Sequence, residues 1–390
     1  MRLRATLKLG AVALAANVVG LSAALALDQS LPAYRAVTGI SGQIRTVGSD
    51  TLGHEVAQWA EAFKGFYSDV KFEIQASGSA TAPPALLEGA SQFGPMSRPM
   101  AAEEAAAFEQ KYGYKVSSFR VAVDALAIYV NKENPIPCLT VQELNRIFSS
   151  TRRTSGGGDI KTWGDAGLTG EWAAKPISLY GRNSISGTYE FFRENTLFSG
   201  EYKGEVKQQT GSEAVVQGVA NDRFAIGYSG IGYKTDGVRT VPLALYPGGT
   251  CHDTSAAATL SGKYPIARYL YVYINKNPNQ PLDPLRSEFI KYVLSKDGQT
   301  QTENGGFYPI TNEIRETEIE EVRNLQDSAG HACRPGNDGI SAGGGNNWPT
   351  TSTTCRFQIL SSSKLKNTGR LSLLVSKARI GLHLPFLLTG

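Results

Sequence analysis

The chain has 390 residues and a formal net charge of +4, with 41% hydrophobic and 19% charged residues. This length allows one large domain or two ordinary ones, and this composition excludes a wholly disordered chain. The small basic excess is not gathered into a stripe. It gives no support to nucleic-acid binding, and we expect no nucleic-acid partner.

The first 26 residues have the pattern of a cleaved secretory signal. A basic start, MRLR with Lys8, precedes a small apolar run over residues 9–25, and Ala-Leu-Ala at 24–26 offers a cleavage site. A membrane anchor needs about 20 strongly apolar residues, whereas this run is alanine-rich and interrupted by Asn17. We therefore expect a mature protein that is periplasmic or secreted.

Units of strand, turn and helix follow one another along the mature chain. The first, IRTVGSDTLGHEVAQWAEAFKGFY, joins a strand and a hydroxyl-rich turn to a helix with Val56, Trp59, Phe63 and Phe66 at helical spacing. The segment VKFEIQASGSATAPPALLEG repeats this order, and its helix is entered through prolines. This alternation predicts α/β layers with largely parallel sheets.

Later units show the same order. A capping box from Thr140 to Glu143 opens a helix, and Ser212 is the expected cap of another helix, which runs into the strand RFAIGYSGIGY. A third helix opens at Asp283, before a proline, and is predicted to stop at Gly298.

Two apolar segments, residues 123–135 and 268–279, both end in Asn-Lys followed by a proline. We interpret them as crossover strands that carry the chain out of a first lobe and back again. Two ordinary buried strands with a chance similarity are the alternative. The interpretation assigns residues 40–130 and 266–326 to lobe I, and residues 131–265 to an inserted lobe II.

The expected export makes disulfide bonds possible, because they persist in oxidising compartments. Cys138 and Cys251 lie just inside the two ends of the inserted lobe, and we predict a disulfide between them; two separate buried thiols are the alternative. Closing so long a loop would stabilise the fold by roughly 4–5 kcal/mol in the chain-entropy model. No CxxC occurs, and His54 and His252 are the only histidines before residue 330, so we expect no metal site.

Residues 327–390 differ in character from the rest of the chain. The first part is low in complexity, and the apolar stretch that follows is broken by basic residues and Pro385, which makes it too charged for a membrane span. We expect a disordered appendage or the product of a reading-frame accident. Cys333 and Cys355 belong to this tail, where they pair with each other or serve its own chemistry.

Three turns rich in glycine and hydroxyl groups each open a helix: Gly48–Thr51, Ser77–Ser79 and Arg182–Thr188. Helix N-termini offer an anion unpaired N–H groups and a partial positive charge. Glycine permits close approach of the backbone, and arginine adds a bidentate clamp. Each turn alone is more often a simple helix cap. Three of them meeting in a cleft between two lobes would enclose a small tetrahedral oxyanion.

In this combination the chain resembles the phosphate-binding proteins that serve bacterial ABC importers. The matching segments are GSDTL, SGSATAPPALLEG, QFGPMSRPM, GRNSISGTYEFF, FAIGYSGIGY, FIKYVLSKDGQ and GGFYPI, in the family's order over residues 44–326. The resemblance implies an α/β, two-lobed periplasmic-binding-protein fold of type II, with the second lobe inserted in the first and two crossover strands joining them. It also implies phosphate contacts from the Thr51 hydroxyl, the Leu52 backbone N–H, Ser79, Arg182, Ser186, Gly187 and Thr188.

Two positions depart from the family's pattern. Ser97 stands where members of the family carry an aspartate that accepts the proton of hydrogen phosphate, and Ser184 stands where a second aspartate braces the arginine. Asp50, in the first turn, and Asp124, at the first crossover strand, are our candidates for the missing carboxylate. For Asp124 a hinge or capping role is the alternative. Arg98 is either a second positive charge at the site or an exposed arginine.

We predict a monomeric, non-catalytic protein without a cofactor, which closes on one inorganic phosphate ion and delivers it to the membrane permease of an ABC importer. A binding protein for sulfate or molybdate is the alternative, since the aspartate missing at Ser97 leaves selectivity open. An exported phosphatase or hydrolase is disfavoured. GYSGIG lacks the G-x-S-x-G spacing, His54 is more typical of a helix surface, and no His/Asp cluster offers metal ligands.

Overall fold

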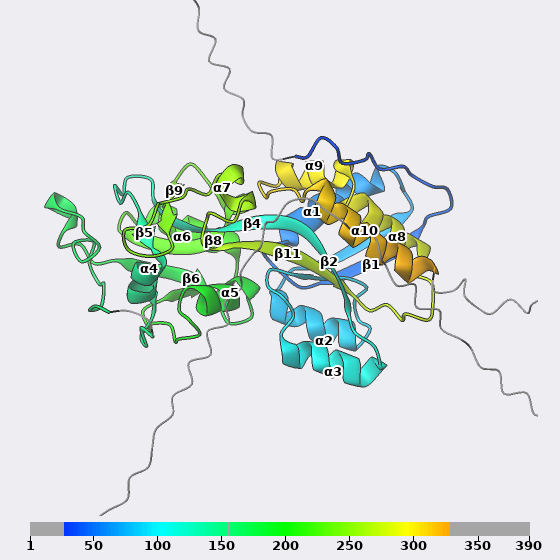
Figure 1. Cartoon of the computed structure of the whole chain (residues 1–390), viewed down its shortest axis with the longest axis horizontal. Helices are drawn as coiled ribbons and strands as arrows, with labels where there is room; N and C mark the ends of the chain where they lie inside the picture. Colours follow the sequence, from blue (N-terminus) through cyan, green and yellow to red (C-terminus); the bar gives the residue numbers. More distant parts are fainter. Residues whose placement is uncertain (1–26, 154–155, 328–390) are drawn as a thin grey trace, which may run out of the picture. The chain divides into compact units, whose positions relative to one another are not determined.

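The computed structural model describes residues 27–153 and 156–327 (Figure 1). The predicted signal segment and nearly all of the predicted tail, including Cys333 and Cys355, lie outside these residues. Within the described ranges, no helix has the length and apolar character needed to span a membrane.

Strands and helices alternate along the described chain, as the sequence predicts. The strands are β1 (Gly42–Val47), β2 (Val70–Gln75), β3 (Gly94–Met96), β4 (Ser117–Asn131), β5 (Leu139–Thr140), β6 (Ser178–Arg182), β7 (Lys207–Gln209), β8 (Ala225–Gly230), β9 (Val238–Thr240), β10 (Leu243–Ala244) and β11 (Ala267–Ile274). The helices are α1 (Gly53–Lys64), α2 (Ala82–Leu87), α3 (Ala102–Tyr112), α4 (Val141–Phe148), α5 (Gly187–Asn195), α6 (Ser212–Asn221), α7 (Ala256–Leu260), α8 (Pro284–Val293), α9 (Lys296–Asn304) and α10 (Asn312–Asp327).

The largest sheet has the strand order β3-β11-β4-β8-β6-β7, with β9 also paired to β4. Strand β4 is antiparallel to both β11 and β8, whereas β6 is parallel to β7 and β8. The prediction of largely parallel sheets is therefore wrong for the centre of this sheet. The reason is the connection itself, because a strand that leaves a lobe and a strand that returns to it run in opposite directions.

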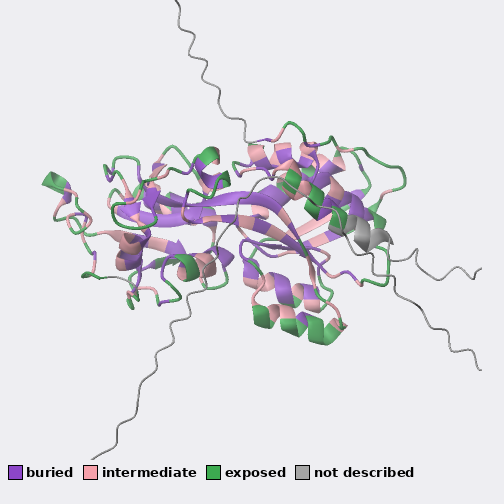
Figure 2. Ribbon diagram, viewed as in Figure 1, coloured by how far each residue is buried: buried purple, intermediate pink, exposed green. Residues whose placement is uncertain are grey.

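Strands β4 and β11 correspond to the two similar apolar segments. Their register pairs Arg268 with Asp124 and Ile274 with Ser117. Figure 1 shows them side by side, passing between the helices α1, α8 and α10 and the elements that lie between β4 and β11 in the chain. Every residue from 121 to 131 is buried (Figure 2), which explains why this strand is apolar throughout instead of alternating.

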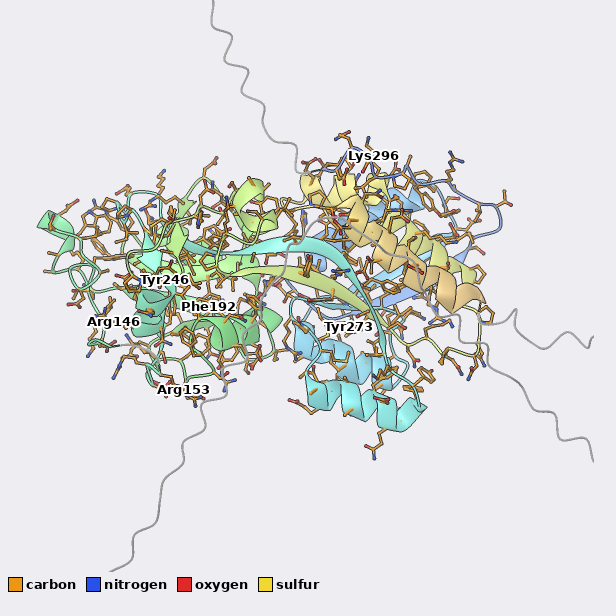
Figure 3. All side chains as sticks on the ribbon, viewed as in Figure 1. Arg146, Arg153, Phe192, Tyr246, Tyr273 and Lys296 are labelled. Carbon is orange, nitrogen blue, oxygen red and sulfur yellow. A yellow bond between two sulfur atoms is a disulfide. The ribbon has the colours of Figure 1, made fainter. Side chains whose placement is uncertain are left out.

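The two largest hydrophobic cores of the described residues draw on different stretches of the crossover strands. The first gathers around Trp59, Phe63 and Phe289. The second gathers around Phe192, which Figure 3 labels on α5, and Tyr228; their rings stack with centroids 4.0 Å apart. We propose the lobe boundaries given above, because the first core draws mainly on residues outside the segment from β4 to β11 and the second on residues within it.

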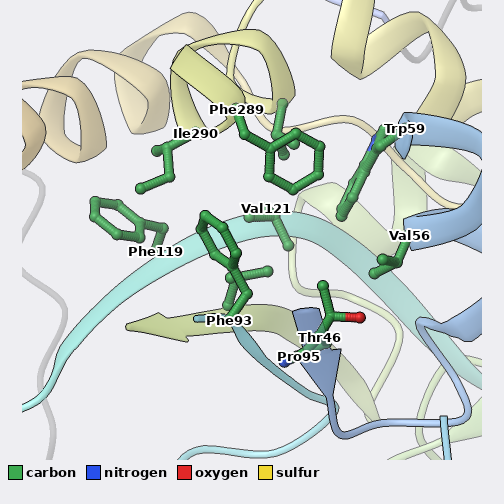
Figure 4. A pocket seen from close by; sticks show the side chains of 11 residues that line it. Thr46, Val56, Trp59, Phe93, Pro95, Phe119, Val121, Phe289 and Ile290 are labelled. Carbon is green, nitrogen blue, oxygen red and sulfur yellow. The ribbon is translucent and has the colours of Figure 1, made fainter. Parts of the chain in front are cut away.

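The first core is closely packed. The cavity shown in Figure 4 has a volume of about 10 Å³ and is lined by apolar side chains, including Trp59, Phe93 and Phe289, and by Thr46. A space of this size is at the lower limit for one water molecule, and an apolar wall offers water few hydrogen bonds. The core thus gives lobe I a rigid base for the turns at its surface.

The predicted disulfide is confirmed. Cys138 and Cys251 are bonded, with Cα atoms 6.2 Å apart and a sequence separation of 113. The bond closes a loop wholly within the segment that links β4 to β11.

Local capping signals are confirmed in one place and wrong in another. Thr140 Oγ1 accepts the N–H of Glu143 at 3.1 Å and the Glu143 carboxylate accepts the N–H of Thr140 at 2.7 Å, as the capping box predicts. The predicted stop at Gly298 is wrong, since α8 ends at Val293 and Gly298 lies inside α9. Ser295 Oγ caps that second helix by accepting the Gly298 N–H.

The prediction that Phe66 belongs to the first helix is also wrong. Helix α1 ends at Lys64, and Phe66 lies beyond it with 43% of its surface exposed. Phe66 is three residues after Phe63, which fits helical spacing, but it belongs to the turn that follows the helix.

Candidate functional site

The three hydroxyl-rich turns lie next to one another. Thr51 Oγ1, just before α1, is 2.9 Å from Thr188 Oγ1 in the first turn of α5. Ala80, in the turn before α2, donates its backbone N–H to the Ile185 carbonyl at 3.1 Å. Both contacts join a turn that precedes β4 to the turn after β6, so segments far apart in sequence form a single site.

The site is withdrawn from solvent. Gly187 is buried, and the Asp50 side chain is 23% exposed. Hydrogen bonds in such an environment are electrostatically stronger than in water, and an unpaired polar group there is costly. The site residues with at most 3% of their surface exposed are Thr51, Leu52, Ser79, Ser97, Asp124, Arg182, Ser186 and Thr188.

Gly187, the first residue of α5, lies against Ser79 and Ser97. A Cβ atom at this position would be 2.8 Å from both Ser79 Cβ and Ser97 Oγ, and closer still to Ser79 Oγ. Ser79 Oγ accepts the Ser97 N–H at 3.0 Å, which holds that hydroxyl in place. Glycine is therefore what allows the N-terminus of α5, with its unpaired N–H groups, to come this close.

Two further predicted residues lie at helix starts. Ser186 is the N-cap of α5, and its Oγ accepts the Thr188 N–H at 3.1 Å. Leu52 is the N-cap residue of α1, and its N–H makes a long hydrogen bond of 3.4 Å to Ser49 Oγ. Both helix starts thus retain donor capacity for an anion.

Arg182, at the end of β6, is held by the first turn and by α6. Its Nη1 is 2.9 Å from Asp50 Oδ2 and donates to Ser212 Oγ at 2.6 Å, while Nη2 donates to the Thr210 carbonyl at 3.0 Å. Burial lowers the pKa of Arg182 and the Asp50 carboxylate opposes this, so the group stays cationic. Within the described part of the chain, its buried Nε has no hydrogen-bond partner.

Asp50 braces Arg182 here, whereas the phosphate-binding proteins that the sequence resembles use an aspartate at the position of Ser184. Its Oδ2 also accepts the N–H and the hydroxyl of Ser212, at 2.8 and 2.7 Å. Ser184, the position that matches the family's bracing aspartate, is exposed. A carboxylate from lobe I thus substitutes for one that is missing from lobe II.

Arg268 is a site residue that the sequence did not reveal. It is 6% exposed, and its Nε and Nη2 donate to Asp124 Oδ2 at 3.0 and 2.8 Å. Its Nη1 donates to the Ser97 carbonyl at 2.8 Å and Nη2 to Thr188 Oγ1 at 2.9 Å. The available signal was a charged residue at the start of an apolar crossover strand, but its position opposite Asp124 required knowledge of the register.

Asp124 is fully buried and both of its oxygens are engaged. Oδ2 takes the two bonds from Arg268, and Oδ1 accepts the N–H of Ile231 at 2.9 Å. Ile231 is the first residue of a short 3₁₀ helix (Ile231–Tyr233), so this contact supports the capping alternative considered for Asp124.

Arg98 is neither exposed nor free for the site. It is 8% exposed, and its Nη1 and Nη2 donate to the Glu104 carboxylate at 2.8 and 2.7 Å. Arg268, not Arg98, is therefore the second cation beside Arg182.

The charges of the site are balanced, with Arg182 facing Asp50 and Arg268 facing Asp124. An anion entering it would be held by directed donors rather than by an excess of positive charge. These donors are the unpaired Nε of Arg182, the hydroxyl groups and the first N–H groups of α5. Such a set suits a small oxyanion whose several oxygen atoms accept hydrogen bonds from different directions.

Comparison with known proteins identifies the family of the chain. Residues 34–297 match the family model described as a PBP superfamily domain. The chain is 51% identical over 308 residues to the phosphate-binding protein PstS of Pseudomonas aeruginosa, which covers 79% of this chain and 95% of that protein.

Solved structures share the fold. A possible phosphate binding protein from Planctomyces limnophilus is 27% identical with a TM-score of 0.55, over 74% of this chain and 99% of that one. A putative phosphate ABC transporter substrate-binding protein from Clostridium perfringens, with bound phosphate, is 24% identical with a TM-score of 0.58, over 69% of this chain and 100% of that one. The chain belongs to the PBP superfamily and, within it, to the family of PstS phosphate-binding proteins.

Proposed function

We propose that this protein binds inorganic phosphate between its two lobes, outside the cytoplasm, and delivers it to the permease of an ABC importer. The observation that carries the proposal is the buried Arg182, whose Nε lacks a partner in the described ranges. Its ion-pair partner Asp50 adjoins Thr51, whose hydroxyl contacts that of Thr188 at the start of α5. A buried, unpaired donor on a cation is costly, and an oxyanion supplies the missing acceptor.

We propose that residues predicted from the sequence make the phosphate contacts. Arg182 Nε, the hydroxyls of Thr51, Ser79 and Thr188, and the N–H groups of Leu52 and Gly187 donate to the phosphate oxygens. Donors from both lobes meet here, so binding favours the closed arrangement over one in which the lobes are apart. The relatives' names support phosphate as the ligand.

Selectivity depends on where the proton of hydrogen phosphate goes. Ser97 stands in place of the family's aspartate, and a hydroxyl accepts a hydrogen bond as well as donating one. Asp50 Oδ2 and both oxygens of Asp124 already accept several hydrogen bonds from the protein. We therefore expect discrimination between phosphate and sulfate to rest on a hydroxyl or on Asp50 Oδ1.

The test is calorimetric titration of the mature chain, from residue 27 onward, after bound anion has been removed by partial unfolding and dialysis. We expect one phosphate per chain, with affinity reduced about 100-fold or more in Arg182→Ala, because a buried charge-assisted contact is lost. Arg223→Ala is the matched control, since the side chain of Arg223 is 42% exposed on lobe II, and it should bind as the unaltered protein does.

Sulfate and molybdate, each at pH 5 and pH 8, separate phosphate binding from the alternative ligand. Absence of phosphate heat at both pH values would overturn the proposal. Tighter binding of sulfate or molybdate than of phosphate would replace it with the other-oxyanion function. Sequencing of the N-terminus of the exported protein checks the expected cleavage before residue 27.

A further inference from the structure

A polar cavity lies in lobe I, away from the proposed phosphate site. Its volume is about 560 Å³, within the range of small-molecule sites. Its walls come from residues 41–43 at the start of β1, the turn 89–92, Tyr114, and residues 275–286 between β11 and α8. The phosphate site begins at the other end of β1, and a strand of this length separates the two by about 20 Å.

Lys276 is a buried cation in this wall. It is 3% exposed, and its Nζ donates to the Asn277 carbonyl at 2.6 Å. No carboxylate pairs with it among residues 27–153 and 156–327, although an ammonium group has three protons to donate. Burial, together with the nearby Arg286, lowers the pKa of Lys276. A buried ammonium group in this position calls for an anionic or strongly polar partner.

The unpaired hydroxyl of Ser91 is a second observation that favours a ligand in this cavity. It is 4% exposed, lines the same cavity, and its Oγ has no hydrogen-bond partner in the part of the chain that the structure describes. Buried hydroxyl groups in proteins nearly always have a partner, so this atom also lacks an expected contact.

The charge of the cavity wall is positive. Lys276 and half-buried Arg286 line it together with one carboxylate, Asp283. Asp283 Oδ1 is already engaged, because it caps α8 by accepting the Arg286 N–H at 3.1 Å. The remaining wall is rich in amide groups, among them Gln43 and Gln92.

We propose that this cavity binds a small hydroxylated organic anion, a sugar carrying a single phosphate or carboxylate group. The anionic group pairs with Lys276 and Arg286, and the hydroxyl groups of the ligand bond to Ser91 and to the amide side chains. A cavity of about 560 Å³ has more room than inorganic phosphate alone would fill. The site is separate from the phosphate cleft, so the proposal does not depend on the function assigned to that cleft.

The experiment uses the mature chain saturated with inorganic phosphate, so that the cleft is already occupied. Glucose 6-phosphate and glucuronate are titrated separately by calorimetry, with glucose as the neutral control. We expect one further ligand per chain for one or both anions, weakened about tenfold or more in Lys276→Gln and in Ser91→Ala. The arm that gives the tighter binding identifies the anionic group.

Lys64→Gln is the matched control, since Lys64 lies on α1, is partly exposed, and is absent from the cavity wall. It should leave sugar binding unchanged, and none of these substitutions should alter the phosphate affinity of the cleft. Thermal unfolding of each variant verifies that it is folded. If Lys276→Gln does not fold, Ser91→Ala alone tests the effect of the cavity wall on sugar binding. The proposal is overturned if neither anion binds at millimolar concentration, if glucose binds equally well, or if both cavity substitutions leave binding unchanged.

Discussion

Replacing Gly187 with alanine tests whether the close approach of α5 to lobe I is needed for phosphate binding. The new Cβ atom would lie 2.8 Å from Ser79 Cβ and from Ser97 Oγ, whereas ordinary contacts of a Cβ begin at 3.4 Å. Ser79 cannot turn aside freely, because it is fully buried and its Oγ accepts the Ser97 N–H. The helix must therefore move back by several tenths of an ångström.

Overpacking of this kind costs about 1–3 kcal/mol. Gly187 lies in the segment between β4 and β11, and Ser79 and Ser97 lie before β4, so opening of the lobes relieves the clash. The cost then falls on the closed, phosphate-bound form alone. The dissociation constant for phosphate should rise about 5- to 150-fold, while the unfolding temperature of the ligand-free protein changes little.

Calorimetric titration with phosphate measures the affinity, and thermal unfolding without phosphate measures the stability. Gly204→Ala is the control, since Gly204 is exposed and a Cβ there would meet nothing within 4 Å. If Gly187→Ala bound phosphate as tightly as the unaltered protein, the close approach of α5 would not be a requirement for binding, and the reasoning would be refuted.

Three further substitutions test other parts of the structure. Asp124→Asn leaves the buried Arg268 without its carboxylate and should lower the free energy of unfolding by about 3–5 kcal/mol in denaturant titrations. Adding phosphate should recover part of this loss. An unchanged free energy of unfolding would show that the fold does not need the pair. Glu55 is fully buried and burial raises its pKa to about 8 from 4.5, so the folded chain holds a proton that the unfolded chain releases in this range. The free energy of unfolding should therefore fall by at most about 5 kcal/mol as the pH rises from 4.5 to about 8. This fall should vanish in Glu55→Gln. Equal pH profiles for both proteins would contradict the raised pKa of Glu55. Replacing both Cys138 and Cys251 with serine should cost roughly 4–5 kcal/mol if the chain-entropy model holds, and an unaltered denaturation midpoint under non-reducing conditions would refute that value.

Local features of the fold and of the site were predictable because their signals lie within a few residues of one another. The capping box from Thr140 to Glu143 and the turn before α5 each depend on a side chain that bonds to a nearby backbone N–H. Where two local signals competed, the prediction failed. Gly298 resembles a helix stop, yet Ser295 three residues earlier caps a new helix that includes it.

The partners of the two arginines were not predictable from local pattern. Arg182 meets Asp50, which comes before β4 in the chain, and Arg268 meets Asp124 across 144 residues of sequence. The sequence shows each charge, but nothing near it indicates which one it will meet. For the same reason Arg98, adjacent to a predicted site residue, is turned to Glu104 and away from the site's hydrogen-bond network.

The sequence by itself indicated the α/β class and the helix starts that carry N–H donors. It favoured, over their alternatives, the two crossover strands and the pairing of Cys138 with Cys251. These follow from short-range periodicity, capping chemistry and the order of elements along the chain. Only the tertiary structure decided that Asp50 replaces the bracing aspartate, that Arg268 completes the site, and that the central strands are antiparallel. Those outcomes depend on strand register and on contacts between segments more than 100 residues apart, which no local pattern encodes.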